Sequence, residues 1–166
     1  MKSFVKSTVI ALGLMTPALA MAASEEHGDW MMYAEDGLCW AVSMPTTWKA
    51  ERGGQTVDAS RGEIRLMVTF RPSDNVKGEV SYNVGYPLRQ DSEVTATIGS
   101  TDVKLYTDGE WAWPYSPSED TKLVSALKRG SSASFIGTSS RGTQTTDTIS
   151  LNGSMAAINA AEEACY

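Results

Sequence analysis

The 166-residue sequence predicts a mostly β, single-domain fold, either an antiparallel β-sandwich or a partly open β-barrel, with two short helices. Apolar and polar residues alternate along most of the chain, which is the pattern of strands with one buried face. Turn dipeptides such as Asp108-Gly109 separate these stretches. Only residues 118–129 and 153–164 break the alternation, and both have the composition of helices.

The first 22 residues have the pattern of a cleaved export signal. Lys2 and Lys6 precede a short apolar run, and small residues at alternate positions fit cleavage after Ala20 or Ala22. The apolar run is shorter than the roughly 20 residues that cross a bilayer. We therefore expect residues 1–22 to be removed, leaving a mature chain without a transmembrane segment in the periplasm, at the outer membrane or outside the cell.

The mature chain is expected to comprise an N-terminal tail at 23–36 and one folded domain at 37–166, since about 145 residues is a common size for a single core. Removal of Lys2 and Lys6 leaves 12 of the 14 Lys+Arg against 20 Asp+Glu, a formal charge of −8. Nucleic-acid affinity comes largely from basic side chains that neutralise phosphates. We therefore expect no nucleic-acid partner.

Strands are predicted where the alternation is clearest. In residues 63–70, for example, Ile64, Leu66, Val68 and Phe70 occupy every second position and would share one face. The full set has about eight strands, at 38–44, 63–70, 80–86, 94–98, 102–107, 110–113, 133–139 and 143–151. Gly-containing turns at 99–100 and 108–109 join three of them as consecutive hairpins.

Both helices carry recognisable end signals or core residues. In 118–129, Ser118 is expected to cap the start, acidic residues occupy the first turn, basic residues the last, and Gly130 follows. The second helix, 153–164, is rich in alanine, which permits close approach to a sheet. The residues expected to face the core are Leu123, Val124, Leu127, Met155 and Ile158.

Cys39 and Cys165 are the only cysteines of the chain. An exported chain meets an oxidising compartment, which favours a disulfide that ties the last helix to the first predicted strand. A redox pair would need neighbouring cysteines, and structural zinc would need four Cys or His ligands. We therefore expect a structural disulfide, no metal site and no cofactor.

The sequence contains no recognisable catalytic constellation. Its single histidine, His27, lies in the expected tail, away from any nucleophile that it would have to activate. The acidic pairs Glu119/Asp120 and Glu162/Glu163 are adjacent on helices and point in different directions, whereas glycoside hydrolysis needs two carboxyls facing one bond. We expect the protein not to be an enzyme.

An aromatic cluster is the best candidate for a binding surface. Trp111, Trp113 and Tyr115 alternate along one strand and therefore share a face. They either fill the core, the interpretation we favour, or form an exposed platform that stacks on sugars, peptides or another protein. Pro114 and Pro117 favour a place at the sheet edge, which keeps the platform open as an alternative.

Arg141 is the second candidate binding residue. Its guanidinium has the geometry to bind a carboxylate ligand through two hydrogen bonds. Alternatively, Arg141 pairs with Asp147 and holds a bend at Gly142, because glycine beside a strand often marks a bulge or a close backbone approach. We favour this structural role.

The C-terminal part carries a specific combination of motifs: ALKRG at 126–130, SSRGT at 139–143 and DTISLNG at 147–153, before a small-residue helix that ends at Cys165. Together with an early Trp30 and Cys39, they make the chain resemble the invasion-associated locus B family. One position departs from the family pattern, since Ser154 stands where an aromatic residue is usual. The resemblance implies an exported, β-sandwich-like envelope protein without assigned enzymatic activity, in a family linked to bacterial invasion of host cells.

Three functional classes follow. The leading one is a non-enzymatic envelope protein that binds a protein or glycan of the bacterial envelope or host surface. The second is a general periplasmic structural or chaperone-like protein, and the third is a cell-wall hydrolase, placed last because an acid/base pair is missing. The candidate binding residues are Trp111, Trp113, Tyr115 and Arg141.

Overall fold

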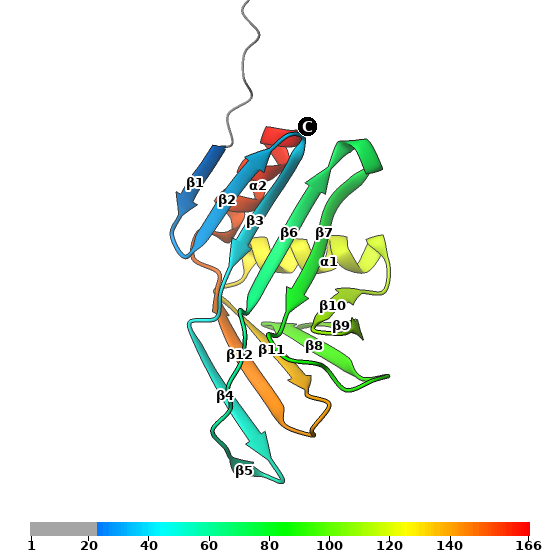
Figure 1. Ribbon diagram of the computed structural model, residues 1–166. Coiled ribbons are helices and arrows are strands. Elements are labelled where there is room, and N and C mark those ends of the chain that lie inside the picture. Colours follow the sequence, from blue (N-terminus) through cyan, green and yellow to red (C-terminus); the bar gives the residue numbers. More distant parts are fainter. Residues whose placement is uncertain (1–22) are drawn as a thin grey trace, which may run out of the picture.

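A computed structural model describes residues 23–166, which form twelve strands, two α-helices and one short 3-10 helix (Figure 1). The expected signal peptide, 1–22, lies outside the described residues. The elements are β1 (Ala23–His27), β2 (Trp30–Glu35), β3 (Leu38–Ser43), β4 (Thr47–Arg52), β5 (Gln55–Thr56), β6 (Arg65–Arg71), η1 (Pro72–Asp74), β7 (Val76–Asn83), β8 (Glu93–Ile98), β9 (Thr101–Asp108), β10 (Trp111–Pro114), α1 (Pro117–Arg129), β11 (Ser132–Thr138), β12 (Gln144–Ser150) and α2 (Ser154–Cys165).

All twelve strands belong to one antiparallel sheet, with the order β1-β2-β3-β6-β7-β10-β9-β8-β11-β12-β4-β5. The mostly β prediction is confirmed, and the sheet does not close into a barrel. The sheet curls strongly. Tyr82 on β7 packs against Phe135 on β11, four strands further along, with 4.3 Å between ring centroids, and only a curled sheet brings these strands together. Figure 1 shows the result as an upper group of strands, β1 to β3 with β6 and β7, above a lower group that includes β4, β5, β11 and β12.

Both helices cover one face of the upper strands. Helix α2 packs on β2 and β3, and α1 packs on β7, β9 and β10. The large side chains between this face and the helices are fully buried: Trp30, Leu66, Val68, Phe70, Val80, Tyr82 and Leu105 from the strands, and Leu123, Leu127 and Ile158 from the helices. In the part of the chain that the structure describes, no element covers the opposite face of β3, β6 and β7.

The two predicted hairpins are confirmed. Residues 99–100 connect β8 to β9, where Ile98 pairs with Thr101. In the second hairpin Asp108 pairs with Trp111, so the two-residue loop is Gly109-Glu110, and Gly109 adopts a left-handed φ of 60°. Glycine populates that region without the steric penalty of a side chain, so the hairpin forms here, although its loop lies one residue later than the predicted turn at 108–109.

The prediction of an N-terminal tail over 23–36 is wrong, since these residues form strands β1 and β2. Trp30 is only 1% exposed, and its indole N–H donates a hydrogen bond to the Ser150 carbonyl at 2.9 Å. The turn between the two strands lies against the start of α2, where a Cβ at Gly153 would approach the His27 carbonyl oxygen to 1.8 Å. His27 is therefore half-buried in a strand rather than in a tail.

The helix predictions are confirmed to within one residue at each end. The cap is different, because Ser116 rather than Ser118 accepts the Glu119 backbone N–H, and Pro117 occupies the first turn. Gly130 follows the helix as expected, with its N–H donated to the Ala126 carbonyl. Proline at the first helical position is preorganised for the helix and has no N–H to leave unpaired.

Most of the predicted core contacts of the helices are correct. Leu123, Leu127 and Ile158 are fully buried, and Val124 packs against the core while half-buried. The prediction that Met155 faces the core is wrong, since its side chain is 49% exposed. Small residues do the packing in α2, because buried alanines let its backbone lie close to the sheet: Ala157 and Ala161.

The predicted disulfide between Cys39 and Cys165 is present and closes a sequence separation of 126 residues. Cys39 lies on β3, the third strand rather than the first, because the preceding tail became a hairpin. Cys165 is the last residue of α2. The bond therefore fixes the C-terminal end of α2 to the middle of the upper strand group.

Asp120 joins α1 to β7 and titrates unusually. Its carboxylate accepts the Val80 backbone N–H at 2.8 Å. Burial raises its pKa from the ordinary 3.8 to about 6, and the negative charges of Glu79 and Glu119 act in the same direction. The folded chain therefore binds this proton more tightly than the unfolded chain does.

We predict that Asp120 makes the protein relatively more stable as the pH falls. This contribution is complete below the unfolded pKa of 3.8 and is lost as the pH rises through about 6. In Asp120→Asn, which keeps an acceptor for Val80 but does not titrate, this dependence should vanish. Urea unfolding at several pH values measures it, with Glu119→Gln as the control. Parallel pH profiles for wild type and Asp120→Asn would contradict the prediction.

Candidate functional site

The face of the sheet opposite the two helices carries a band of aromatic side chains, which we call the aromatic face. It follows from the alternation, because each strand points one set of residues into the core and the other set outward. The outward set includes several large apolar residues. The residues that define the aromatic face are Tyr33 on β2, Trp40 on β3, Met67 on β6, Trp111 and Trp113 on β10, Tyr106 on β9, and Tyr115 just after β10.

These aromatic rings form two stacks. Tyr33 and Trp40 are cross-strand partners on β2 and β3, with ring centroids 5.5 Å apart and planes inclined by 20°. The second stack is larger and lies on β9 and β10: Trp111 to Trp113 at 6.2 Å, Trp113 to Tyr106 at 5.6 Å, and Tyr106 to Tyr115 at 5.5 Å.

A groove of about 320 Å³ separates the two stacks. Trp40 forms one wall, and Trp111 and Trp113 form the other. Its floor comes from β6 and β7, where Thr69 and Ser81 are short and almost fully buried. Large rings flanking small hydroxyl residues leave the hollow between them.

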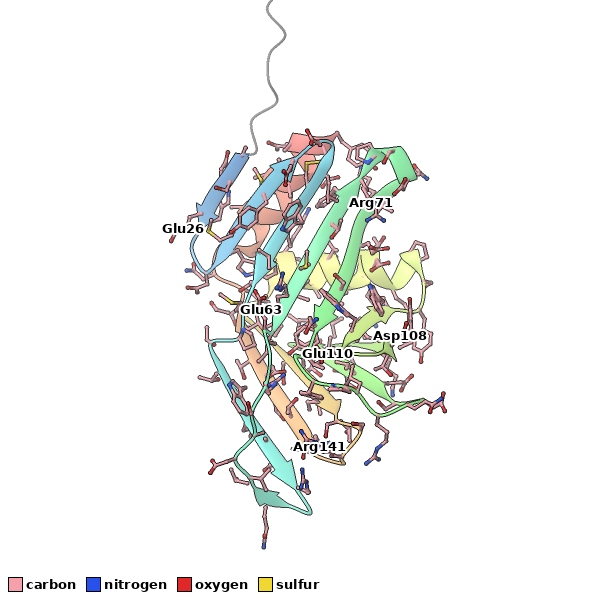
Figure 2. All side chains as sticks on the ribbon, in the orientation of Figure 1. Glu26, Glu63, Arg71, Asp108, Glu110 and Arg141 are labelled. Atoms are coloured by element: carbon pink, nitrogen blue, oxygen red, sulfur yellow. A yellow bond between two sulfur atoms is a disulfide. The ribbon has the colours of Figure 1, made fainter. Side chains whose placement is uncertain are left out.

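Charged and polar groups accompany the apolar walls. Thr69 pairs with Glu79 across β6 and β7, and both residues line the groove. Arg71, at the upper end of β6 in Figure 2, also lines it and pairs with Asp74 at 2.7 Å. The groove therefore offers aromatic surface, hydroxyls and charges of both signs, which is the composition of a binding site with an apolar centre and a polar rim.

The structure places the predicted cluster on the surface, so the core location that we favoured for it is wrong. Trp111 and Trp113 are half-buried and Tyr115 is 56% exposed, whereas the intervening Ala112 points into the core. The expected edge position is also wrong, since β10 lies between β7 and β9. Its pairing with β7 is short, however, and involves only Trp111 and Ala112.

Sequence reasoning missed the other wall of the groove. Tyr33 fell in the expected tail, and Trp40 was counted only as part of a strand. A usable signal was present, because Asp36-Gly37 is a favoured two-residue hairpin turn and both residues adopt left-handed φ angles. A hairpin about this turn pairs Tyr33 with Trp40.

Arg141 lies elsewhere, and its predicted partner is wrong. It is exposed on the turn between β11 and β12, in the lower half of the molecule, far from Arg71 and the groove (Figure 2). Asp147 pairs instead with Arg61. Gly142 does adopt a left-handed φ of 84° in the turn beside Arg141.

The ion pair between Arg61 and Asp147 is buried, with side chains 3% and 1% exposed. Besides a direct contact through Nη1, Arg61 Nη2 donates to Asp147 Oδ2 at 2.8 Å, and Nε donates to the Val84 carbonyl at 3.0 Å. The guanidinium also lies over the Trp48 and Tyr86 rings, with 5.1 Å from its carbon to each ring centroid.

A tyrosine completes this buried network. The Tyr82 hydroxyl, on β7, donates to Asp147 on β12. Burial, together with the negative charge of Asp147, raises the pKa of Tyr82 far above its usual value, so the hydroxyl stays a donor throughout the physiological range. The network connects β7, β12 and the segment before β6, and its groups are mutually satisfied. It is therefore a structural junction of the curled sheet.

The described residues hold no group of three or more His, Cys, Asp or Glu side chains arranged to bind a metal ion. Within residues 23–166, no helix has the length and apolar character needed to cross a membrane.

Comparison with solved structures finds a likeness to the crystal structure of invasion associated protein B from Bartonella henselae. The TM-score is 0.55 and the sequence identity is 16%, over 83% of this chain and 94% of that chain. No protein-family model and no curated protein matches the sequence. At this identity the likeness shows a shared fold, and that fold agrees with the family resemblance carried by the C-terminal motifs.

Proposed function

We propose that this protein is a non-enzymatic, exported envelope protein of the invasion-associated locus B family that binds a partner protein through the aromatic groove. The observation that carries the proposal is the pair of half-buried aromatic stacks at the surface, on either side of one groove. The fold shared with invasion associated protein B and the export signal predicted from the sequence support the family and the location.

The aromatic face has the composition of an interaction surface. Binding energy at protein interfaces concentrates in a few residues, and Trp, Tyr and Arg are the types enriched among them. Trp40, Trp111, Trp113 and Arg71 all line this groove. Soluble proteins rarely leave contiguous apolar patches exposed without a role, so the uncovered aromatic face indicates a partner.

The extent of the surface favours a protein over a small ligand. The groove itself would accept one large anchoring side chain. Beyond it, Tyr106 and Tyr115 extend the stack to one side and Tyr33 extends it to the other. A partner that covers all of these rings contacts six strands, which is more than one sugar ring or small molecule spans.

We predict that Trp111→Ala/Trp113→Ala weakens partner binding about thirtyfold or more, since hot-spot truncations exceed about 2 kcal/mol. The measurement is photo-cross-linking in cells from a probe at Met67, in the groove, followed by affinity measurement with the captured partner. Tyr166→Ala, which removes an exposed ring outside the aromatic face, is the matched control and should bind normally.

Three outcomes separate the alternatives. The proposal is supported if the wild type and the control capture a discrete protein that the groove variant does not capture. Capture that survives protease but not periodate would replace the protein partner with a glycan. Equal capture of the partner by the wild type and the folded groove variant would overturn the groove as the binding site. It would favour a general structural or chaperone-like role.

A further inference from the structure

A second hollow, separate from the aromatic groove, opens at the turn between β11 and β12. It has a volume of about 210 Å³ and lies between this turn, the end of β4 and the segment that precedes β6. Arg52 and Arg141 contribute to its lining from two sides, and Arg61 contributes from the buried junction. Figure 2 shows Arg141 at this lower end, away from the groove.

The charge of this pocket is opposite to that of the chain as a whole. Among the described residues, Arg65 and Arg71 form ion pairs and Arg61 is neutralised by Asp147, but neither Arg52 nor Arg141 has a carboxylate within ion-pair distance. The guanidinium of a further arginine, Arg89, also reaches the turn: a Cβ built at Gly142 would lie 3.3 Å from its Nη2.

For two buried hydroxyl groups in the pocket, the described part of the chain offers no acceptor to the hydroxyl proton. Thr143 Oγ1 accepts Arg52 Nε at 3.0 Å, and Ser139 Oγ accepts the Thr143 backbone N–H at 3.0 Å. Both side chains are more than nine-tenths buried, and within the described residues neither donates its own hydrogen. A buried donor without an acceptor is unfavourable, so these hydroxyls are suited to a ligand that only accepts.

A third hydroxyl proton is available beside them. Tyr86 OH and Thr145 Oγ1 lie 2.6 Å apart, and only one of the two donates to the other. The remaining proton belongs to a residue that lines the pocket. Asp58 is the one carboxylate in the lining, and it is exposed. Two arginines without a carboxylate partner among the described residues, against one aspartate, leave the pocket positive.

We propose that this pocket binds an oxyanion, that is, a carboxylate or phosphate group. Both groups present several acceptor oxygens and no competing donors when ionised, and both match the fork of an arginine side chain. The pocket volume suits one such group with its first attached atoms rather than a nucleotide or a polymer. The proposal is independent of the aromatic groove.

The test is a calorimetric titration of the mature chain with inorganic phosphate and, separately, with acetate, at constant ionic strength set with chloride. We expect saturable binding of one equivalent of at least one of the two anions, and the stronger arm identifies the class of ligand. Arg141→Gln should weaken binding at least about tenfold. Arg129→Gln, at an exposed arginine at the end of α1, should leave binding unchanged.

Further variants keep the result interpretable. Arg52→Gln should weaken binding in the same way, and amide NMR shifts on anion addition should concentrate at residues 139–145. Arg141→Lys, which keeps the charge but loses the fork, should bind with intermediate affinity. Absence of saturable binding by either anion, or equal affinity of the wild type, Arg141→Gln and Arg52→Gln, would overturn the proposal.

Discussion

Replacing Asp147 with alanine is expected to lower the free energy of unfolding by about 3–5 kcal/mol, because it leaves a buried charge without its partner. The Arg61 side chain is only 3% exposed, so its charge would remain largely buried. The same substitution removes the acceptor of the Tyr82 hydroxyl, which is also buried. Urea unfolding at neutral pH, followed by circular dichroism, measures the change.

The matched control replaces both charges. Breaking a buried ion pair is costly, whereas exchanging the whole pair for apolar residues is often nearly neutral. Arg61→Met/Asp147→Leu/Tyr82→Phe should therefore be more stable than Asp147→Ala, although it removes more polar groups. If the triple variant loses at least as much stability as the single one, the ion pair is not the reason for the loss.

Removal of the disulfide is expected to have a similarly large effect. In the chain-entropy model a closed loop of this length constrains the unfolded state by about 5 kcal/mol, given the sequence separation of 126 between Cys39 and Cys165. Cys39→Ala/Cys165→Ala should therefore unfold at a markedly lower urea concentration. Wild type measured with and without a reducing agent is the control, and reduction should reproduce the effect of the substitution.

Removal of the disulfide should destabilise α2 more than the rest of the fold. This helix packs largely through small residues, with Ala157, Ala161 and Ile158 buried against the sheet. Without the covalent bond at its end, its amides should exchange with solvent faster than those of α1. Equal protection of the two helices, together with an unchanged unfolding midpoint, would show that packing alone holds α2 in place.

The sequence by itself determined the features that depend on local chemistry. The C-terminal end of α1 follows from the end signal at Gly130, and the hairpin at Gly109 follows from a turn that requires a left-handed residue. The disulfide followed from elimination, because Cys39 and Cys165 have no other partner. In each case the signal lies in residues whose identity limits the outcome directly.

Strand β2 was missed because its alternation is hidden, whereas β1 has no buried face that could produce an alternation. Trp30 and Met32 face the core, but the intervening Met31 and Tyr33 are also apolar, since Tyr33 belongs to the aromatic face. The period-two signal depends on a polar outer face. The aromatic face thus removed the contrast by which β2 would have been recognised.

Only the tertiary structure decided which face became the core and which charges met. A period of two shows that Trp111 and Trp113 share a face, but it is symmetric, so it does not say whether that face points inward. The helices settle this by covering the other side of the sheet. Likewise Asp147 pairs with Arg61, 86 residues away, rather than with the nearby Arg141, because the curl of the sheet, and not sequence distance, brings side chains together.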